Sequence, residues 1–250
     1  MGNWVEEFYT RQYAWAPFLT GDVAPEHQAR VEDLVRLAGA GPWRVLELGA
    51  GPGQTAAGLA DAGHTVTAVE LTGIAVEAAQ RLASRPRRGR LQVVQGDFYT
   101  IDLPGPFDVV GYWDGFGIGS DEDQGRLLGR IAAWLAPGGC ALIDINTPWY
   151  WARVAGQEMT FPDFGRRYHF DADGCRLLDT WWPTGDPGQA VTQSLRCYSP
   201  ADLRLLLRGT GLTLADLEPG GAVTDYAAGH FEPHVPLGQA MSYRAKLTRD

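Results

Sequence analysis

The segment of this 250-residue chain most able to do chemistry is a glycine loop that follows a short apolar run. The loop reads Glu47-Leu-Gly49-Ala-Gly51-Pro-Gly53, and a helix is predicted after it over 55–62. Glycine lets a backbone turn sharply and lets a ligand approach the main chain closely. A loop between a strand and a helix lies at the carboxyl end of the strand, where open α/β sheets bind ligands. The sequence therefore predicts a ligand site here.

The spacing of the glycines narrows the choice of ligand. In the dinucleotide fingerprint Gly-x-Gly-x-x-Gly the third glycine would fall on Gln54, which disfavours NAD. The chain has no Gly-Lys-Ser/Thr after the loop, so a phosphate-cradling P-loop is excluded. Glu70 ends the next predicted strand, where an acid accepts hydrogen bonds from ribose hydroxyls. A ribose is common to NAD and S-adenosylmethionine (SAM), so Glu70 alone does not separate them.

The elements around the loop alternate in type. Apolar runs predict strands, and patterns of helical period predict the helices between them. The predicted strands are 45–48, 65–69, 91–95, 107–112 and 140–145, and the predicted helices are 4–18, 26–38, 55–62, 74–84 and 120–136. Strands that alternate with helices at this spacing indicate an α/β fold, a parallel sheet with helices on both faces.

The pattern changes after residue 146. Residues 147–165 are rich in Pro, Gly and aromatic residues and read as a loop or lid. The strands predicted over 166–182 and 189–198, with a turn at Asp173-Gly174, indicate an antiparallel insertion. Ser199 and Pro200 begin a helix, and strands over 212–217 and 239–247 follow.

Five motifs occur in an order typical of one family. They are the loop at 47–53, Glu70, Gly96-Asp97-Phe98, Phe107-Asp-Val-Val110 and Leu135-Ala-Pro-Gly-Gly139. On these motifs the chain resembles the class I SAM-dependent methyltransferases of the small-molecule type, most strongly over 40–146.

The resemblance implies a Rossmann-like sheet of seven strands, mostly parallel with the last strand antiparallel. It also implies a division of the chain. Residues 1–40 would form an N-terminal helical cap, and 41–250 the SAM-binding domain, with a lid and antiparallel insertion at 147–198.

The resemblance also assigns the cofactor loop residue by residue. Glu47 would orient the amino group of SAM, and Gly49, Ala50 and Gly51 would pass under its methionine and ribose portions. Glu70 would hold both ribose hydroxyls.

Five further residues would complete this SAM site. Leu71 would lie against the adenine, Asp97 would accept from its amino group, and Phe98 would add an apolar face. Trp113 would lie near the methionine portion. Tyr13 resembles a tyrosine that closes over the cofactor, although packing of an amphipathic helix explains it equally well.

Four residues are candidates for a catalytic base. His230 and His234 lie in a long connection between the last two strands, and long loops often carry function. His169 lies in the predicted insertion, and Asp114 follows Trp113. A lone histidine is usually structural, and an Asp in a loop often caps it, so each keeps that second interpretation.

Aromatic residues suggest the nature of the acceptor. Tyr112, Trp113 and Phe116 follow the fourth strand, and Trp149-Tyr-Trp151 follows the fifth. Aromatic side chains line apolar ligand pockets, which favours an aromatic or otherwise apolar metabolite. The chain lacks Asn/Asp-Pro-Pro-Tyr after the fourth strand, which argues against methylation of a nucleobase amino group. Oxygen, nitrogen and carbon acceptors all stay open.

The composition of the chain limits the classes of partner that it can bind. The net charge of −9 argues against nucleic acid and against an anionic membrane, and no apolar run approaches the ~20 residues of a membrane span. The three cysteines follow no metal spacing and indicate reduced thiols in the cytoplasm.

We expect a monomer or homodimer that acts on a small molecule in specialised metabolism. Cyclisation or decarboxylation on the same fold, or a non-enzymatic SAM-binding module, are the alternatives.

Overall fold

A seven-stranded sheet is the frame of the protein in the computed structural model, which describes residues 4–249. The strand order is β10-β13-β5-β4-β1-β2-β3, and only β13 runs antiparallel to its neighbours. The strands are β1 (Arg44–Leu48), β2 (Thr65–Glu70), β3 (Arg90–Gln95), β4 (Phe107–Tyr112), β5 (Leu135–Asn146), β10 (Leu212–Pro219) and β13 (Ser242–Arg249). The predicted mostly parallel sheet with an antiparallel last strand is confirmed.

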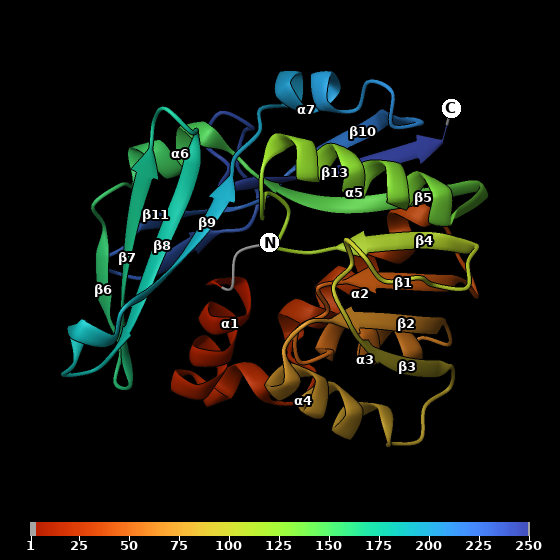
Figure 1. Cartoon of the computed structure of the whole chain (residues 1–250), viewed down its shortest axis with the longest axis horizontal. Coiled ribbons are helices and arrows are strands. Elements are labelled where there is room, and N and C mark those ends of the chain that lie inside the picture. The colour runs from red at the N-terminus through yellow and green to blue at the C-terminus, as the bar shows by residue number, and fades with distance from the viewer. Residues whose placement is uncertain (1–3, 250) are drawn as a thin grey trace.

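Helices cover both faces of this sheet (Figure 1). The helices are α2 (Pro25–Ala38), α3 (Gln54–Asp61), α4 (Gly73–Ala83), α5 (Asp121–Trp134) and α7 (Pro200–Leu206). Leu34 of α2 and Leu59 of α3 are fully buried in one core, and Leu127 of α5 and Leu203 of α7 are fully buried in the core of the opposite face. Among residues 4–249, no helix is long and apolar enough to cross a membrane.

A smaller antiparallel sheet stands beside the main one. It has the order β6-β7-β8-β9, and a separate hairpin pairs β11 with β12. These strands are β6 (Glu158–Thr160), β7 (Phe164–Asp171), β8 (Arg176–Pro183), β9 (Val191–Arg196), β11 (Ala222–Asp225) and β12 (His230–Glu232). The remaining elements are α1 (Trp4–Trp15), α6 (Pro148–Arg153) and the 3-10 turns Pro17–Thr20 and Pro187–Gln189.

Figure 1 shows α1 (red) between the two sheets. It packs on β9 of the smaller sheet and on α4 beside the main sheet. The cap predicted over 1–40 therefore begins with a helix that bridges two parts of the fold. Residues 1–3 of that cap lie outside the described residues.

The structure corrects the interpretation of 147–165 as an irregular loop. Pro148 begins the short helix α6, since proline is favoured in the first turn of a helix, and β6 follows. Tyr150 is 0% and Trp151 4% exposed, and the Trp149 indole donates to the carbonyl of Leu237 at 2.8 Å. The aromatic run is therefore largely buried, and Trp151 also lines a cavity.

Several boundaries also differ from the prediction. The N-terminal helix ends at Trp15 rather than 18, because Pro17 cannot continue it. The fifth strand begins at Leu135 and runs through the Pro-Gly-Gly segment 137–139 that was predicted to separate helix from strand.

Candidate functional site

A cavity of about 540 Å³ lies at the carboxyl ends of β1, β2 and β4, under α1. Its lining includes all ten residues predicted to bind the cofactor: Tyr13, Glu47, Gly49, Ala50, Gly51, Glu70, Leu71, Asp97, Phe98 and Trp113. The fold thus brings together residues spread over a hundred positions of sequence. We refer to this space as the cofactor cavity.

The conformation of the glycine loop is incompatible with larger side chains at its glycine positions. Gly49 and Gly51 have φ of +57° and +54°, in the left-handed region that favours glycine. A Cβ atom on Gly51 would lie 2.8 Å from the Tyr13 hydroxyl, and one on Gly53 would lie 2.7 Å from Cβ of Ala79. The loop therefore leaves its main chain open to the cavity, and Tyr13 of α1 approaches that main chain directly.

Glu70 holds the loop in place. Its Oε2 accepts from the Gly51 N–H at 2.9 Å, and its Oε1 accepts from the N–H and the hydroxyl of Thr72, both at 2.8 Å. A carboxylate oxygen has two acceptor sites, so Oε2 keeps one for a ligand hydroxyl. Glu70 can therefore both fix the loop and bind a ribose.

Glu47 is a buried carboxyl group with an unused oxygen. It is 1% exposed, and no hydrogen-bond partner for its Oε2 exists among residues 4–249. Burial raises the pKa of Glu47 to about 8, against the opposing effect of the Arg30 charge. An orphaned buried carboxyl is costly, and a cationic ligand group would relieve that cost. The amino group of SAM fits this requirement.

The far end of the cofactor cavity is apolar with one acid. Leu71 and Phe98 line it, and Phe98 packs on the buried Tyr112 ring with the centroids 5.3 Å apart. Asp97 accepts from the Tyr99 N–H through Oδ1. An adenine ring, flat and apolar with a polar edge, fits these groups.

α1 closes the cofactor cavity with two tyrosines. The rings of Tyr9 and Tyr13 stack with centroids 6.4 Å apart, and both line the cavity. Burial, with a further contribution from Glu70, raises the pKa of Tyr13 well above its usual value. Burial also raises the pKa of Tyr9, so both phenols stay neutral near pH 7.

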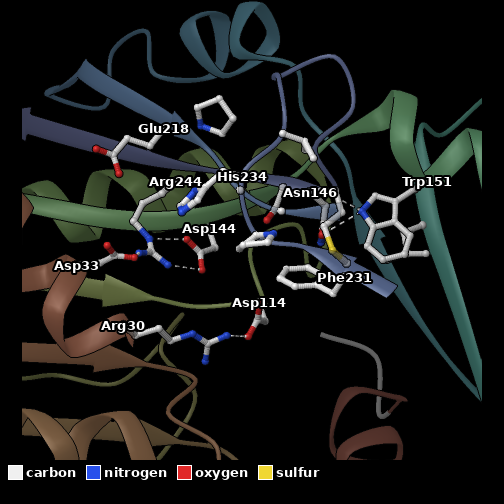
Figure 2. A pocket seen from close by; sticks show the side chains of 18 of the residues that line it. Arg30, Asp33, Asp114, Asp144, Asn146, Trp151, Glu218, Phe231, His234 and Arg244 are labelled. Carbon is white, nitrogen blue, oxygen red and sulfur yellow. Dashed lines mark hydrogen bonds and ion pairs between the residues drawn. The ribbon is translucent and has the colours of Figure 1, made fainter. Parts of the chain in front are cut away.

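A second cavity of about 840 Å³ lies beside the first, and we refer to it as the acceptor cavity. Figure 2 shows part of its lining, including Arg30, Asp33, Asp114, Asp144, Glu218 and Arg244. Arg36 binds Glu218 with two hydrogen bonds of 2.5 and 2.7 Å. Arg244 binds Asp144 at 2.8 and 3.0 Å and Asp33 at 2.5 Å. Four arginines and four acids line this cavity, so its charged groups are balanced.

The two cavities meet at four residues. Arg30, Asp114, Arg166 and Gln193 line both of them. Asp114 has φ of +60°, which an Asp tolerates better than most residues, and its carboxylate is 70% exposed. It forms an ion pair with Arg30 of α2 (Figure 2). A ligand in one cavity would reach a ligand in the other at this junction.

The four candidate bases lie in different places. Asp114 lies at the junction, and His234 lines the acceptor cavity. His169 is exposed on β7, and His230 is exposed on β12 with its Nε2 4.0 Å from Glu232. Neither His169 nor His230 lines a cavity.

Sequence reasoning missed three of the junction residues. Arg30 lies one helical turn before Leu34, on the stripe that carries Val31, so its spacing held a signal of an inward position. Arg166 and Gln193 lie on strands of the insertion, where the pattern does not say which face meets the main sheet.

The sequence of this chain is similar to those of known methyltransferases. Residues 45–139 match the family described as "Methyltransferase domain". The chain is 28% identical over 196 residues to the cypemycin N-terminal methyltransferase of Streptomyces sp., covering 74% of this chain and 78% of that protein.

Solved structures show the same fold. The CcbJ methyltransferase from Streptomyces caelestis has a TM-score of 0.73 at 20% identity, covering 99% of this chain and 97% of that one. The glycopeptide N-methyltransferase MtfA has a TM-score of 0.60 at 21% identity, covering 92% and 93%. MtfA has also been solved with SAM and with S-adenosylhomocysteine.

Substitution of Glu70 by Ala is expected to weaken binding of S-adenosylhomocysteine by about 1–3 kcal/mol, since it leaves ligand hydroxyls and the Gly51 N–H unpaired. Titration calorimetry measures this change. Glu77→Ala, at an exposed position of α4, is the control and should bind as the wild type does. Unchanged affinity in Glu70→Ala would remove Glu70 from the site.

The raised pKa of Glu47 predicts a pH effect on the ligand-free protein. Between about pH 4.5 and 8 the folded state holds a proton that the unfolded state has released, so stability falls as pH rises through this window. One such group changes the unfolding free energy by at most about 1.4 kcal/mol per pH unit. Urea unfolding of Glu47→Gln should lack this part of the decline, whereas the exposed-site control Glu77→Gln should keep it. Equal pH profiles for Glu47→Gln and the wild type would contradict the assignment.

Proposed function

This chain belongs to the class I SAM-dependent methyltransferases, and we propose that it methylates an amine nitrogen of a small natural product or a peptide. The observation that carries the proposal is the junction of the two cavities at Asp114, whose exposed carboxylate can hold an amine next to the cofactor. Two relatives are named for nitrogen or N-terminal methylation, which supports the same choice.

We propose that Glu47, Glu70 and Asp97 hold the cofactor by its amino group, ribose and adenine, with Tyr13 closing over it. The glycine loop Gly49-Ala-Gly51 supplies the close main-chain surface, and Leu71, Phe98 and Trp113 supply apolar walls. Bound SAM supplies a methyl group activated by its sulfonium, which a nucleophile displaces in line. The protein contributes positioning and exclusion of water.

An amine reacts only through a free lone pair, so the protein must hold it and let its proton leave. Asp114 is the proposed orienting group, because its carboxylate accepts a hydrogen bond from the amine at the junction. Arg30 keeps that carboxylate in place through the ion pair. His234, in the lining of the acceptor cavity, is a second candidate to receive the proton. His169 and His230 line neither cavity and have no part in this proposal.

The lining of the acceptor cavity favours a polar acceptor with an apolar portion. Four arginines, four acids and Asn146 face it, together with Trp151, Leu177 and Phe231. The aromatic run that suggested an aromatic or otherwise apolar acceptor is largely packed into the core, as Tyr150 illustrates. We therefore propose an amine-bearing metabolite or peptide of specialised metabolism in place of a plain aromatic compound, made and methylated in the cytoplasm.

The experiment is methyl transfer from SAM carrying a labelled methyl group to matched panels of amines, alcohols and carbon acids, read by product mass. An amine product that gains one methylene unit is the expected result. If the labelled methyl group appears only in alcohols or carbon acids, nitrogen is not the acceptor atom and the proposal is overturned. A product without the added methylene would indicate cyclisation or decarboxylation instead.

Asp114→Asn in the same assay should lower kcat at least tenfold, because an amide orients and deprotonates an amine poorly. Asn tolerates the positive φ, so the backbone should persist. Binding of S-adenosylhomocysteine should change less than twofold. Asp102→Asn, at an exposed position, is the control, and wild-type turnover in Asp114→Asn would contradict the role.

A further inference from the structure

Arg166 of β7 lies at the junction of the cavities, where one acid and two aromatic rings hold its guanidinium. Its Nε and Nη2 donate to Oδ1 and Oδ2 of Asp179 at 2.8 and 2.7 Å. Its guanidinium carbon lies 4.8 Å from the ring centroids of both Tyr168 and Trp181. A guanidinium fixed by a carboxylate and by aromatic rings has little freedom left, so it presents a rigid group to the cavities.

Asp179 is the anchor of this arrangement. It is 0% exposed, and its Oδ2 also accepts from the Trp181 indole at 3.0 Å and from Gln193 Nε2 at 2.8 Å. The negative charge of Asp179 is therefore shared among donors from three side chains. The Arg166 guanidinium receives only part of it and remains an effective charge-assisted donor.

One edge of Arg166 is open. Arginine has five N–H donors, and Asp179 uses the pair on the Nε side. Among residues 4–249 no hydrogen-bond partner of Nη1 is present, and the side chain is 26% exposed although its anchor is fully buried. The open edge, formed by Nη1 and the second N–H of Nη2, is thus the part left to face the cavities. Such a fork matches a carboxylate in bidentate geometry.

The other arginines that line the acceptor cavity already form ion pairs with acids of that cavity. Arg36 and Arg244 each bind two acids of the cavity, and Arg30 binds Asp114. Arg166 differs because its acid lies behind it, outside the lining. An anion that enters the cavity therefore meets Arg166 without first displacing an acid of the wall.

We infer that the open edge of Arg166 binds a carboxylate of the acceptor, so that the substrate carries both an amine and a carboxylate. This rests on the proposed function in placing the amine at Asp114, on the same junction. Substrates of this class are amino acids and peptides or metabolites that end in an amino-acid unit.

The anchor also connects the carboxylate site to the cap. Gln193, which donates to Asp179, accepts from the Tyr9 hydroxyl of α1 at 3.2 Å. Tyr13 of the same helix lies over the cofactor loop. The placement of Arg166 and the closure over the cofactor therefore share one hydrogen-bonded network.

The test measures binding rather than turnover. The probe is hippurate, a carboxylate without a reactive amine, and its matched partner is hippuramide; calorimetry is done on protein saturated with S-adenosylhomocysteine. The wild type should bind hippurate at least tenfold more tightly than hippuramide. Arg166→Lys, which keeps the charge but loses the fork, should reduce this ratio to within twofold.

Arg167→Lys is the matched control, because Arg167 is the next residue of β7 but faces outward to Glu158. It should keep the wild-type ratio. If thermal unfolding shows that Arg166→Lys does not fold, the double variant Arg166→Gln/Asp179→Asn replaces it, since it leaves no unpaired buried charge. A wild type that binds hippurate no better than hippuramide, or not at all, overturns the inference, as does a wild-type ratio in the Arg166 variant.

A second pair of probes, phenylalanine and phenylalanine amide, distinguishes free amino acids from larger carboxylates as the substrate class. Tenfold preference for phenylalanine places the amine next to the carboxylate, whereas preference for hippurate alone places the carboxylate farther from the reacting nitrogen. Binding of hippurate is independent of methyl transfer, because hippurate accepts no methyl group. If the protein prefers hippurate to hippuramide but methylates no amine, the proposed function is wrong and the carboxylate site is still supported.

Discussion

The ion pair between Arg30 and Asp114 stands where the two cavities of this protein join, and the surrounding elements serve to place it. Ion pairs this exposed contribute only about 0–1 kcal/mol to stability, and Asp114 adopts a left-handed backbone that is sparsely populated. The pair is therefore poorly explained as a stabilising contact. Its position between a cofactor cavity and a polar acceptor cavity explains it better.

Each layer of the fold contributes one wall of that junction. The parallel sheet brings the ends of β1, β2 and β4 together, and so places Glu47, Glu70 and Asp114 along one edge. α2 supplies Arg30 from behind this edge. The antiparallel sheet supplies Arg166 and closes the space on the other side. Transfer between two bound molecules needs such an enclosed meeting point, because water must be excluded and both reactants held.

That the glycine loop and Glu70 would meet at one cavity was predictable because the signals for this arrangement are local. A strand, a glycine loop and an acid at the next strand end require only neighbouring elements, so the residues at 47–51 and Glu70 could be placed from the order of motifs alone. The acceptor side was not predictable. Whether Arg166 faces inward depends on how the smaller sheet packs on the main one, and strand alternation gives only two options without saying which is buried. The aromatic run at 149–151 could be predicted only in part, since a helix that starts at Pro148 turns Tyr150 into the core while Trp151 lines the larger cavity.

A crystal of the protein soaked with S-adenosylhomocysteine tests the central claim most directly, since the claim is that the smaller cavity holds the cofactor and the larger one the acceptor. The account predicts density in the 540 Å³ cavity, with the ligand amino group at Glu47, the ribose at Glu70 and the sulfur facing Asp114. Density in the 840 Å³ cavity, against Asp144, Glu218 and Arg244, would contradict it.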